Sequence, residues 1–227
     1  MKEQHADQGY RGFWSTMKNM TWKERGKHFL FYYGKYVLLG AFIIYMLCDL
    51  AYESLIKEKP EELLRGTAVN VKVSLELEDA LTEGAFTSMG GTDTEKQTIT
   101  LVASLISHTD YIGSTAMQTK LLSGAYDYAI MDQTGLDMLA PMDAFPDMNL
   151  LLPEEKLEQW HERFAYVRKD GVDYPVAINI TGMPITEDLT YEGEYVYLAF
   201  CVNNERVDVA EPFYDYLVEA GLLVPDA

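Results

Sequence analysis

The chain is poor in cysteine, in basic residues and in motifs that mark a catalytic or metal site. Its 227 residues include two cysteines, Cys48 in an apolar run and Cys201 in a distant apolar segment, so no disulfide framework is expected. Lysine and arginine number 18 against 36 acidic residues, which gives a net charge of −18. This acidity excludes nucleic acid as a partner of the acidic part of the chain.

The motifs of the common enzyme families are also missing. The chain has no P-loop, no G-x-G-x-x-G, no G-x-S-x-G, no H-E-x-x-H and no C-x-x-C. The histidines His5, His28, His108 and His161 do not have the spacing of metal ligands. The sequence therefore predicts no catalytic site, no metal and no cofactor, and a protein that is not an enzyme.

One long apolar segment lies between Phe29 and Ile56. At ~1.5 Å per residue, its uncharged core covers only about 20 Å of a hydrocarbon layer ~30 Å thick. The methylene stem of Lys35 places its ammonium at the headgroups, so the aromatic residues before it extend the stretch. The segment predicts a transmembrane helix over 29–56 in contact with the lipid bilayer, with a buried core helix as the alternative. The uncharged core consists of Tyr36, Val37, Leu38, Leu39, Gly40, Ala41, Phe42, Ile43, Ile44, Tyr45, Met46, Leu47 and Cys48.

The charges around this segment predict its orientation. Residues 1–35 hold seven basic and three acidic residues, a balance of +4, which leaves 11 basic and 33 acidic residues, or −22, for the rest. Basic residues near the start of a span favour a cytoplasmic N-terminus. A cleaved signal peptide fits less well because no small-x-small site follows, and Leu47 before Cys48 disfavours a lipid anchor. We therefore expect a basic cytoplasmic tail over 1–28, with a capping box at Thr21–Glu24, and an extracellular C-terminal part.

The residues after the span suffice for one domain. The charged segment 57–68, with Pro60, predicts a juxtamembrane linker, and 69–227 predicts an α/β domain. Strict alternation predicts a strand over 69–77, and apolar runs predict strands over 98–103 and 128–131. Helices are expected between them, over 79–89 and from a cap at Ser114 to Leu122. Alternating strands and helices imply a largely parallel sheet.

The pattern changes after Asp132. Residues 136–152 predict a loop, and Pro153 predicts the start of a helix with Leu157, Trp160 and Phe164 on one face. Further segments predict a hairpin of 165–168 and 172–180, a central strand buried on both faces over 195–202, and a final helix over 209–220.

Two parts of the chain carry a resemblance to a known family. Lys120–Asp132 combines a helix, a small-Gly-x-x-Asp turn and an apolar strand, and Asp170–Pro175 is later followed by a strand and Asn203-Asn204 before the last helix. Both resemble type 2 periplasmic solute-binding proteins, over about 69–227. The whole layout resembles anchored membrane proteins of Gram-positive bacteria. The resemblance implies a mostly parallel mixed sheet similar to one lobe of that family, and the short segment 133–172 implies a reduced second lobe.

A binding site is expected beyond the carboxyl ends of the parallel strands. Polar residues follow three of the predicted strands, and the sequence predicts that they bind a ligand. The alternative is that they are ordinary loop residues and helix caps. The candidates are Ser107, Thr109, Asp110, Asp132, Gln133, Thr134 and Thr181.

Together these features predict a single-pass membrane protein of the cell surface with a domain similar to solute-binding proteins. We expect the domain to bind a small solute or peptide and to serve a membrane-protein partner, either a transporter or a sensor. The alternative is a scaffold subunit of a cell-envelope complex without a small ligand. A hydrolase is a third candidate, but it would require an activated nucleophile that the sequence lacks.

Overall fold

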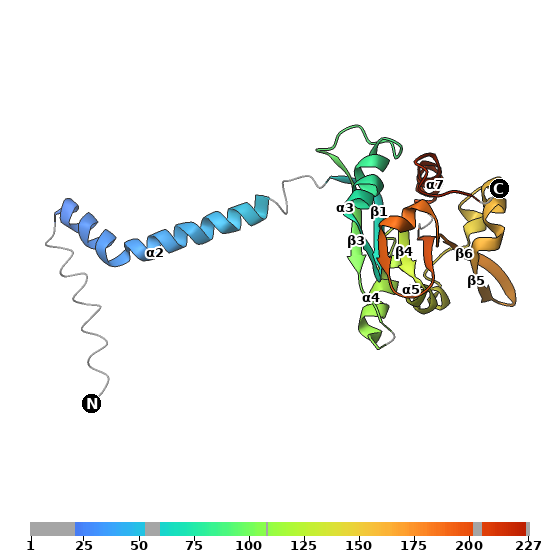
Figure 1. Ribbon diagram of the computed structural model, residues 1–227. Helices are drawn as coiled ribbons and strands as arrows, with labels where there is room; N and C mark the ends of the chain where they lie inside the picture. The colour runs from blue at the N-terminus through green and yellow to red at the C-terminus, as the bar shows by residue number, and fades with distance from the viewer. Residues whose placement is uncertain (1–20, 53–59, 108, 202–205, 226–227) are drawn as a thin grey trace, which may run out of the picture. The chain divides into compact units, whose positions relative to one another are not determined.

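The computed structural model describes residues 21–52, 60–107, 109–201 and 206–225. The chain divides into two compact units, Met1–Lys59 and Pro60–Ala227. The first contains helix α2 (Trp22–Ala51; Figure 1). At its start, the Glu24 carboxylate accepts hydrogen bonds from the backbone N–H and the hydroxyl of Thr21, both at 2.9 Å. Glu24 therefore reaches back to Thr21 as predicted, and the bond from the Thr21 backbone lowers the pKa of Glu24.

Helix α2 covers most of the predicted span, whose residues 53–56 lie outside the described residues. Large apolar side chains are exposed at consecutive positions, including 36–39 and 42–47. Because successive helical residues point about 100° apart, this apolar surface encircles the helix instead of forming one stripe. Among the described residues, no helix combines the length and the apolarity needed to cross a membrane.

The second unit contains a six-stranded mixed sheet with the order β3-β1-β4-β8-β6-β5 (Figure 1). Strands β3, β1 and β4 are parallel, and β8 is antiparallel to both β4 and β6. Four strands therefore run in one direction, and the predicted α/β class with a mixed, mostly parallel sheet is confirmed. The strands are β1 (Glu61–Val69), β3 (Gln97–Ser104), β4 (Tyr128–Asp132), β5 (Phe164–Lys169), β6 (Val172–Asn179) and β8 (Val196–Phe200).

Both faces of the sheet are covered. All five residues of β4 are buried. Tyr128 and Ile130 contribute to one apolar cluster, whereas Ala129 and Met131 contribute to the other. Two helical layers thus enclose the sheet. The first cluster includes residues of α3 (Leu75–Asp79), of the π-helical turn Ala80–Gly84 that follows it and of α7 (Ala210–Glu219), and the second includes residues of α4 (Tyr111–Leu122) and α5 (Gln133–Leu139).

The single strand predicted over 69–77 is wrong. Strand β1 starts at Glu61, inside the segment expected to be a linker, and ends at Val69. Asn70 has a φ of 58°, a left-handed conformation that ends the strand, although the apolar alternation continues through it. The following β2 (Val71–Val73) pairs with β7 (Leu189–Tyr191) in a separate two-stranded sheet. Ser74 then caps α3 by accepting a hydrogen bond from the N–H of Leu77.

Three helix predictions need smaller corrections. Helix α4 starts at Tyr111 and is capped by Asp110, so Ser114 is not the cap but a buried residue inside the helix. The predicted loop 136–152 begins within α5, whose N-terminus is capped by Asp132. The helix after Pro153, α6 (Glu154–Leu157), is short and continues as a 3-10 helix over Glu158–Arg163.

Three other elements predicted for the C-terminal half are present in the structure. Strands β5 and β6 form the predicted hairpin, and its turn holds Asp170 and Gly171 at φ values of 53° and 83°. These left-handed conformations suit an Asp-Gly pair in a two-residue hairpin turn. Strand β8 is buried throughout and lies inside the sheet, as predicted. The predicted final helix is α7.

The Tyr128 hydroxyl gives the first testable prediction. The side chain is fully buried against the ring of Phe213, and its hydroxyl has no hydrogen-bond partner among the described residues. Burial raises the pKa of Tyr128, which therefore stays protonated. Because an unsatisfied buried polar group costs ~1–3 kcal/mol, Tyr128→Phe is expected to raise the free energy of unfolding by about 1 kcal/mol in urea titrations.

Tyr214→Phe is the matched control for Tyr128→Phe. The Tyr214 hydroxyl accepts a hydrogen bond of 2.9 Å from the indole Nε1 of Trp160. Its removal is expected to lower the free energy of unfolding by about 1 kcal/mol. A loss of stability in Tyr128→Phe as large as that in Tyr214→Phe would show that the Tyr128 hydroxyl has a partner.

Candidate ligand-binding site

The strand order of the sheet has a topological switch point at β1. The chain places β3 on one side of β1, and the strand after β3 in this sheet, β4, lies on the other side of β1. The three strands are parallel, so their carboxyl ends at Val69, Ser104 and Asp132 lie at the same edge of the sheet. In open α/β sheets, the crevice at such a switch point is the usual place for a ligand.

Asn70 joins the ends of all three strands. Its side-chain nitrogen Nδ2 donates to Oδ1 of Asp132 at 3.1 Å, and its Oδ1 accepts from the backbone N–H of Ile106 at 2.7 Å. Its own N–H donates to the carbonyl of Ser104 at 2.8 Å. The left-handed backbone of Asn70 and its amide therefore fix the loops after β1, β3 and β4 relative to each other.

Asp132 is nearly fully buried at this junction. The oxygen that binds Asn70 also accepts from the backbone N–H of Gly135 at 2.7 Å, which caps helix α5. An acidic cap is favoured by the partial positive charge of a helix N-terminus. One carboxylate oxygen of Asp132 therefore has a structural role. This role agrees with the alternative interpretation, in which the candidate residues include helix caps.

A cavity of about 390 Å³ lies at this junction. Its volume is at the lower end of the range for small-molecule sites, roughly 300–1,000 Å³. The lining combines hydroxyls, an amide, a carboxylate and apolar surface, with one exposed basic residue, Lys72, and one exposed acidic residue, Glu192. The lining residues are Asn70, Lys72, Leu105, Ile106, Ser107, Asp132, Thr134, Thr190, Tyr191 and Glu192.

The cavity brings together three of the seven predicted residues, Ser107, Asp132 and Thr134. Thr109 is next to it, because its Oγ1 lies 3.1 Å from Oγ of Ser107. Asp110 instead caps α4, with Oδ1 accepting from the N–H of Gly113 at 2.9 Å. The structure therefore brings together the candidates from the loop after β3 and from the end of β4, whereas Asp110 is a helix cap.

The other two predicted residues have partners elsewhere. The Gln133 side chain accepts a hydrogen bond from the Tyr197 hydroxyl and donates to Oδ1 of Asp137 at 2.7 Å. The Thr181 hydroxyl accepts from the N–H of Val196 at 3.0 Å, at the start of β8. Neither residue lines the cavity, because Gln133 points towards β8 and Thr181 closes the connection between β6 and β8.

Sequence reasoning missed the residues that β2 and β7 contribute. The sequence predicts Lys72 within one long strand over 69–77, and it predicts no element that contains Thr190, Tyr191 or Glu192. Asn70 carried a usable signal, because asparagine is enriched in the left-handed conformation where a chain turns. The pairing of β2 with β7 joins segments more than 110 residues apart, and no local pattern indicates it.

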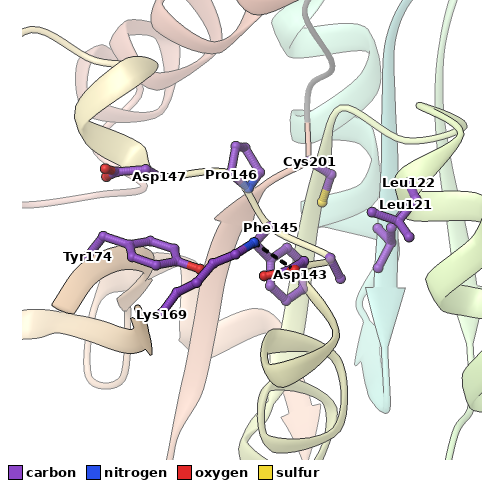
Figure 2. Close-up of a pocket in the computed structure, with 10 residues that line it drawn as sticks. Leu121, Leu122, Asp143, Phe145, Pro146, Asp147, Lys169, Tyr174 and Cys201 are labelled. Atoms are coloured by element: carbon purple, nitrogen blue, oxygen red, sulfur yellow. Dashed lines mark hydrogen bonds and ion pairs between the residues drawn. The ribbon is translucent and has the colours of Figure 1, made fainter. Parts of the chain in front are cut away.

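A second cavity of about 490 Å³ lies at the other ends of the strands, near the start of β4 (Figure 2). Cys201 lines it and follows Phe200, the last residue of β8, which pairs with Tyr128, the first residue of β4. Figure 2 shows Lys169 extended towards Asp143, with which it forms an ion pair at 2.7 Å.

The chemistry of this second cavity is weak. Burial raises the pKa of the Cys201 thiol, which keeps it protonated and unreactive. The charge of Lys169 is matched by Asp143, and none of the predicted site residues lines the cavity. Among the described residues, no group of three or more histidine, cysteine or acidic side chains is arranged to hold a metal ion. We therefore take the cavity at the strand ends as the candidate site.

Comparisons with known proteins give no relative from which a function can be transferred. No protein-family model, no curated protein and no solved structure matches this chain.

Proposed function

We propose that the second unit binds a small polar solute in the cavity at the carboxyl ends of β1, β3 and β4. The observation that carries this proposal is that Ser107, Asp132 and Thr134, chosen from the sequence as ligand-binding residues, line one cavity at the switch point of the sheet. The exposed Lys72 and Glu192 offer charges of both signs. The volume suits a small molecule better than a peptide.

The proposal includes a membrane location with a cytoplasmic N-terminus and an extracellular binding domain. Two observations support it: the basic excess of residues 1–35, and the exposed apolar surface that encircles α2. The uncharged core of 36–48 is short, so the proposal requires Lys35 to extend its ammonium to the headgroups. In this setting, the domain would present its solute to a transporter or a sensor in the same membrane.

One observation favours the alternative of a scaffold subunit. The described residues of the second unit form one large sheet and the two-stranded β2–β7 sheet, without a second full lobe opposite the cavity. The type 2 solute-binding proteins that the sequence resembles hold their ligand between two lobes. A single lobe leaves one side of a bound solute in water, which limits affinity. If no small molecule binds, we propose that the domain recognises a protein of the cell envelope.

Thermal unfolding of the full-length protein in detergent tests solute binding. Amino acids, sugars, short peptides and metal ions are screened one class at a time. A ligand at 100 times its Kd stabilises the folded state by about 2.7 kcal/mol, which corresponds to a rise in Tm of roughly 5–10 °C for a domain of this size. We expect one class of small polar molecules to give such a rise.

Two variants link that rise to the cavity. Lys72→Met and Thr134→Val remove polar groups that line it, and each is expected to weaken binding about tenfold without changing the Tm of the free protein. Lys120→Met is the matched control, because Lys120 is exposed on α4 and does not line the cavity. A screen without any stabilising molecule, or an equal loss in Lys120→Met, would contradict the proposal.

A further inference from the structure

Strand β3 is an edge strand with an open side. It pairs with β1 along its whole length, and within the described residues no strand pairs with its other side. The surface here is partly apolar, because Val102 is 43% exposed and Leu105, just beyond the strand, is 82% exposed. An open edge presents backbone N–H and C=O groups that can accept another strand.

The two edges of the sheet differ in their protection. The opposite edge strand, β5, carries Arg168 and Lys169, which form ion pairs of 2.7 Å with Asp173 and Asp143. Charged side chains of this kind disfavour edge-to-edge pairing. By contrast, residues 97–109 contain no charged side chain in a chain that is 24% charged.

A groove of about 780 Å³ runs along the open edge. Strand residues 97–102 form one side, and the helical segment after β2 contributes Glu78, Thr82, Glu83 and Phe86. Glu78 and Glu83 are exposed, and no basic residue lines the groove. The groove is therefore acidic and has an apolar contact at Phe86.

The charge of the domain determines which partner fits. Residues 60–227 hold nine basic and thirty acidic residues, a balance of −21. Two copies of such a domain repel each other, so pairing of β3 with β3 of a second copy is disfavoured. A segment rich in lysine or arginine would instead be attracted both by the domain as a whole and by Glu78 and Glu83.

We propose that β3 binds an extended, positively charged polypeptide segment of a partner protein, which adds to the sheet as a further strand. Its backbone forms hydrogen bonds with the open side of β3, and its basic side chains face Glu78 and Glu83. Alternate side chains of the added strand point to opposite faces, so a pattern of alternating basic and apolar residues suits the groove. The inference is independent of solute binding, because the groove and the strand-end cavity share no lining residue.

A labelled ten-residue peptide of alternating lysine and valine tests this inference by fluorescence anisotropy with the full-length protein in a zwitterionic detergent. The double variant Glu78→Lys/Glu83→Lys is expected to weaken binding by about tenfold or more. The matched control, Glu155→Lys/Glu158→Lys, changes the net charge equally at exposed positions outside the groove, and it is expected to bind within about twofold of wild type.

A second peptide, N-methylated at alternate residues on the edge that would face β3, tests the backbone contacts. It keeps every charge but cannot donate the hydrogen bonds of an added strand, so its binding is expected to be lost. Equal weakening by the two double variants, or equal binding of the N-methylated peptide, would reduce the interaction to general electrostatic attraction and overturn the inference. It would also be overturned if sedimentation of the free protein revealed a dimer that the peptide dissociates.

Discussion

Replacing Asp127 by alanine is expected to lower the free energy of unfolding of the second unit by about 3 kcal/mol. Asp127 is 1% exposed, and its carboxylate accepts hydrogen bonds from both Arg65 and Arg206. The closest side-chain contacts are 3.0 Å from Nη2 of Arg65 and 2.7 Å from Nε of Arg206. The hydrogen bond to Asp127 raises the pKa of Arg206. Without the carboxylate, the guanidinium groups of Arg65 and Arg206 would both lose the acceptor that they share.

The size of this effect follows from burial. Breaking a buried charge pair costs about 3–5 kcal/mol, because the remaining charge is left unpaired in a poorly hydrated place. The side chains of Arg65 and Arg206 are 19% and 27% exposed, so water moderates the loss and the lower end applies. Asp127 also has a backbone role, since its N–H donates to the carbonyl of Arg65 and its carbonyl accepts from the N–H of Cys201, contacts that alanine can keep.

Urea unfolding of Asp127→Ala beside Asp173→Ala provides the comparison. Asp173 forms an equally short two-point contact with Arg168, but on the surface of the β5–β6 hairpin. Exposed ion pairs are screened by water and salt, so the second change is expected to have a much smaller effect. If the two variants unfolded at the same urea concentration, the Asp127 cluster would be no more stabilising than a surface pair.

Protease added to intact cells is expected to remove the domain 60–227 almost completely and to leave the segment before the span intact. This outcome follows from the proposed orientation, in which the basic excess of residues 1–35 stays inside the cell. Trypsin cuts after lysine, so cleavage at Lys57 or Lys59, the last lysines before the second unit in the sequence, would release that unit. Epitope tags at the two ends of the chain, read by immunoblotting, follow both fragments.

The control for the protease experiment is the same digestion after the cells are permeabilised. Both tags are then expected to be lost, because the short N-terminal tail contains several lysines and arginines. Survival of the C-terminal tag on intact cells, with loss only after permeabilisation, would refute the extracellular location. Recovery of the full-length chain from the soluble fraction without detergent would refute the membrane anchor.

Elements with their own apolar pattern were predicted well, and elements defined by distant partners were not. The buried strand β8, the β5–β6 hairpin and helix α7 each have a local signal: an unbroken apolar run, an Asp-Gly turn and a 3.6-residue periodicity. By contrast, the alternation of 69–77 predicted one strand because apolar periodicity does not register a single left-handed residue at Asn70.

The sequence also indicated only those residues of the candidate cavity whose position depends on local pattern. The rule for strand ends identified Ser107, Asp132 and Thr134, because it needs only the position of each parallel strand along the sequence. Thr181 does not line the cavity, because it follows β6, which is separated from β4 by β8 in the sheet. Lys72 and Glu192 required knowledge of the β2–β7 pairing, which depends on tertiary structure.

The position of β8 also affects how the polypeptide can acquire its structure during synthesis. Within the described residues, the β5–β6 hairpin reaches the rest of the sheet only through β8, which comes after the other five strands along the chain. The ribosome must therefore release residues 196–200 before the early strands and the hairpin can join. Until then, the completed β1, β3 and β4 have an uncovered hydrogen-bonding side at β4. A chain that stalls or is cut before this point would leave two unjoined halves for chaperones and quality-control proteases to recognise.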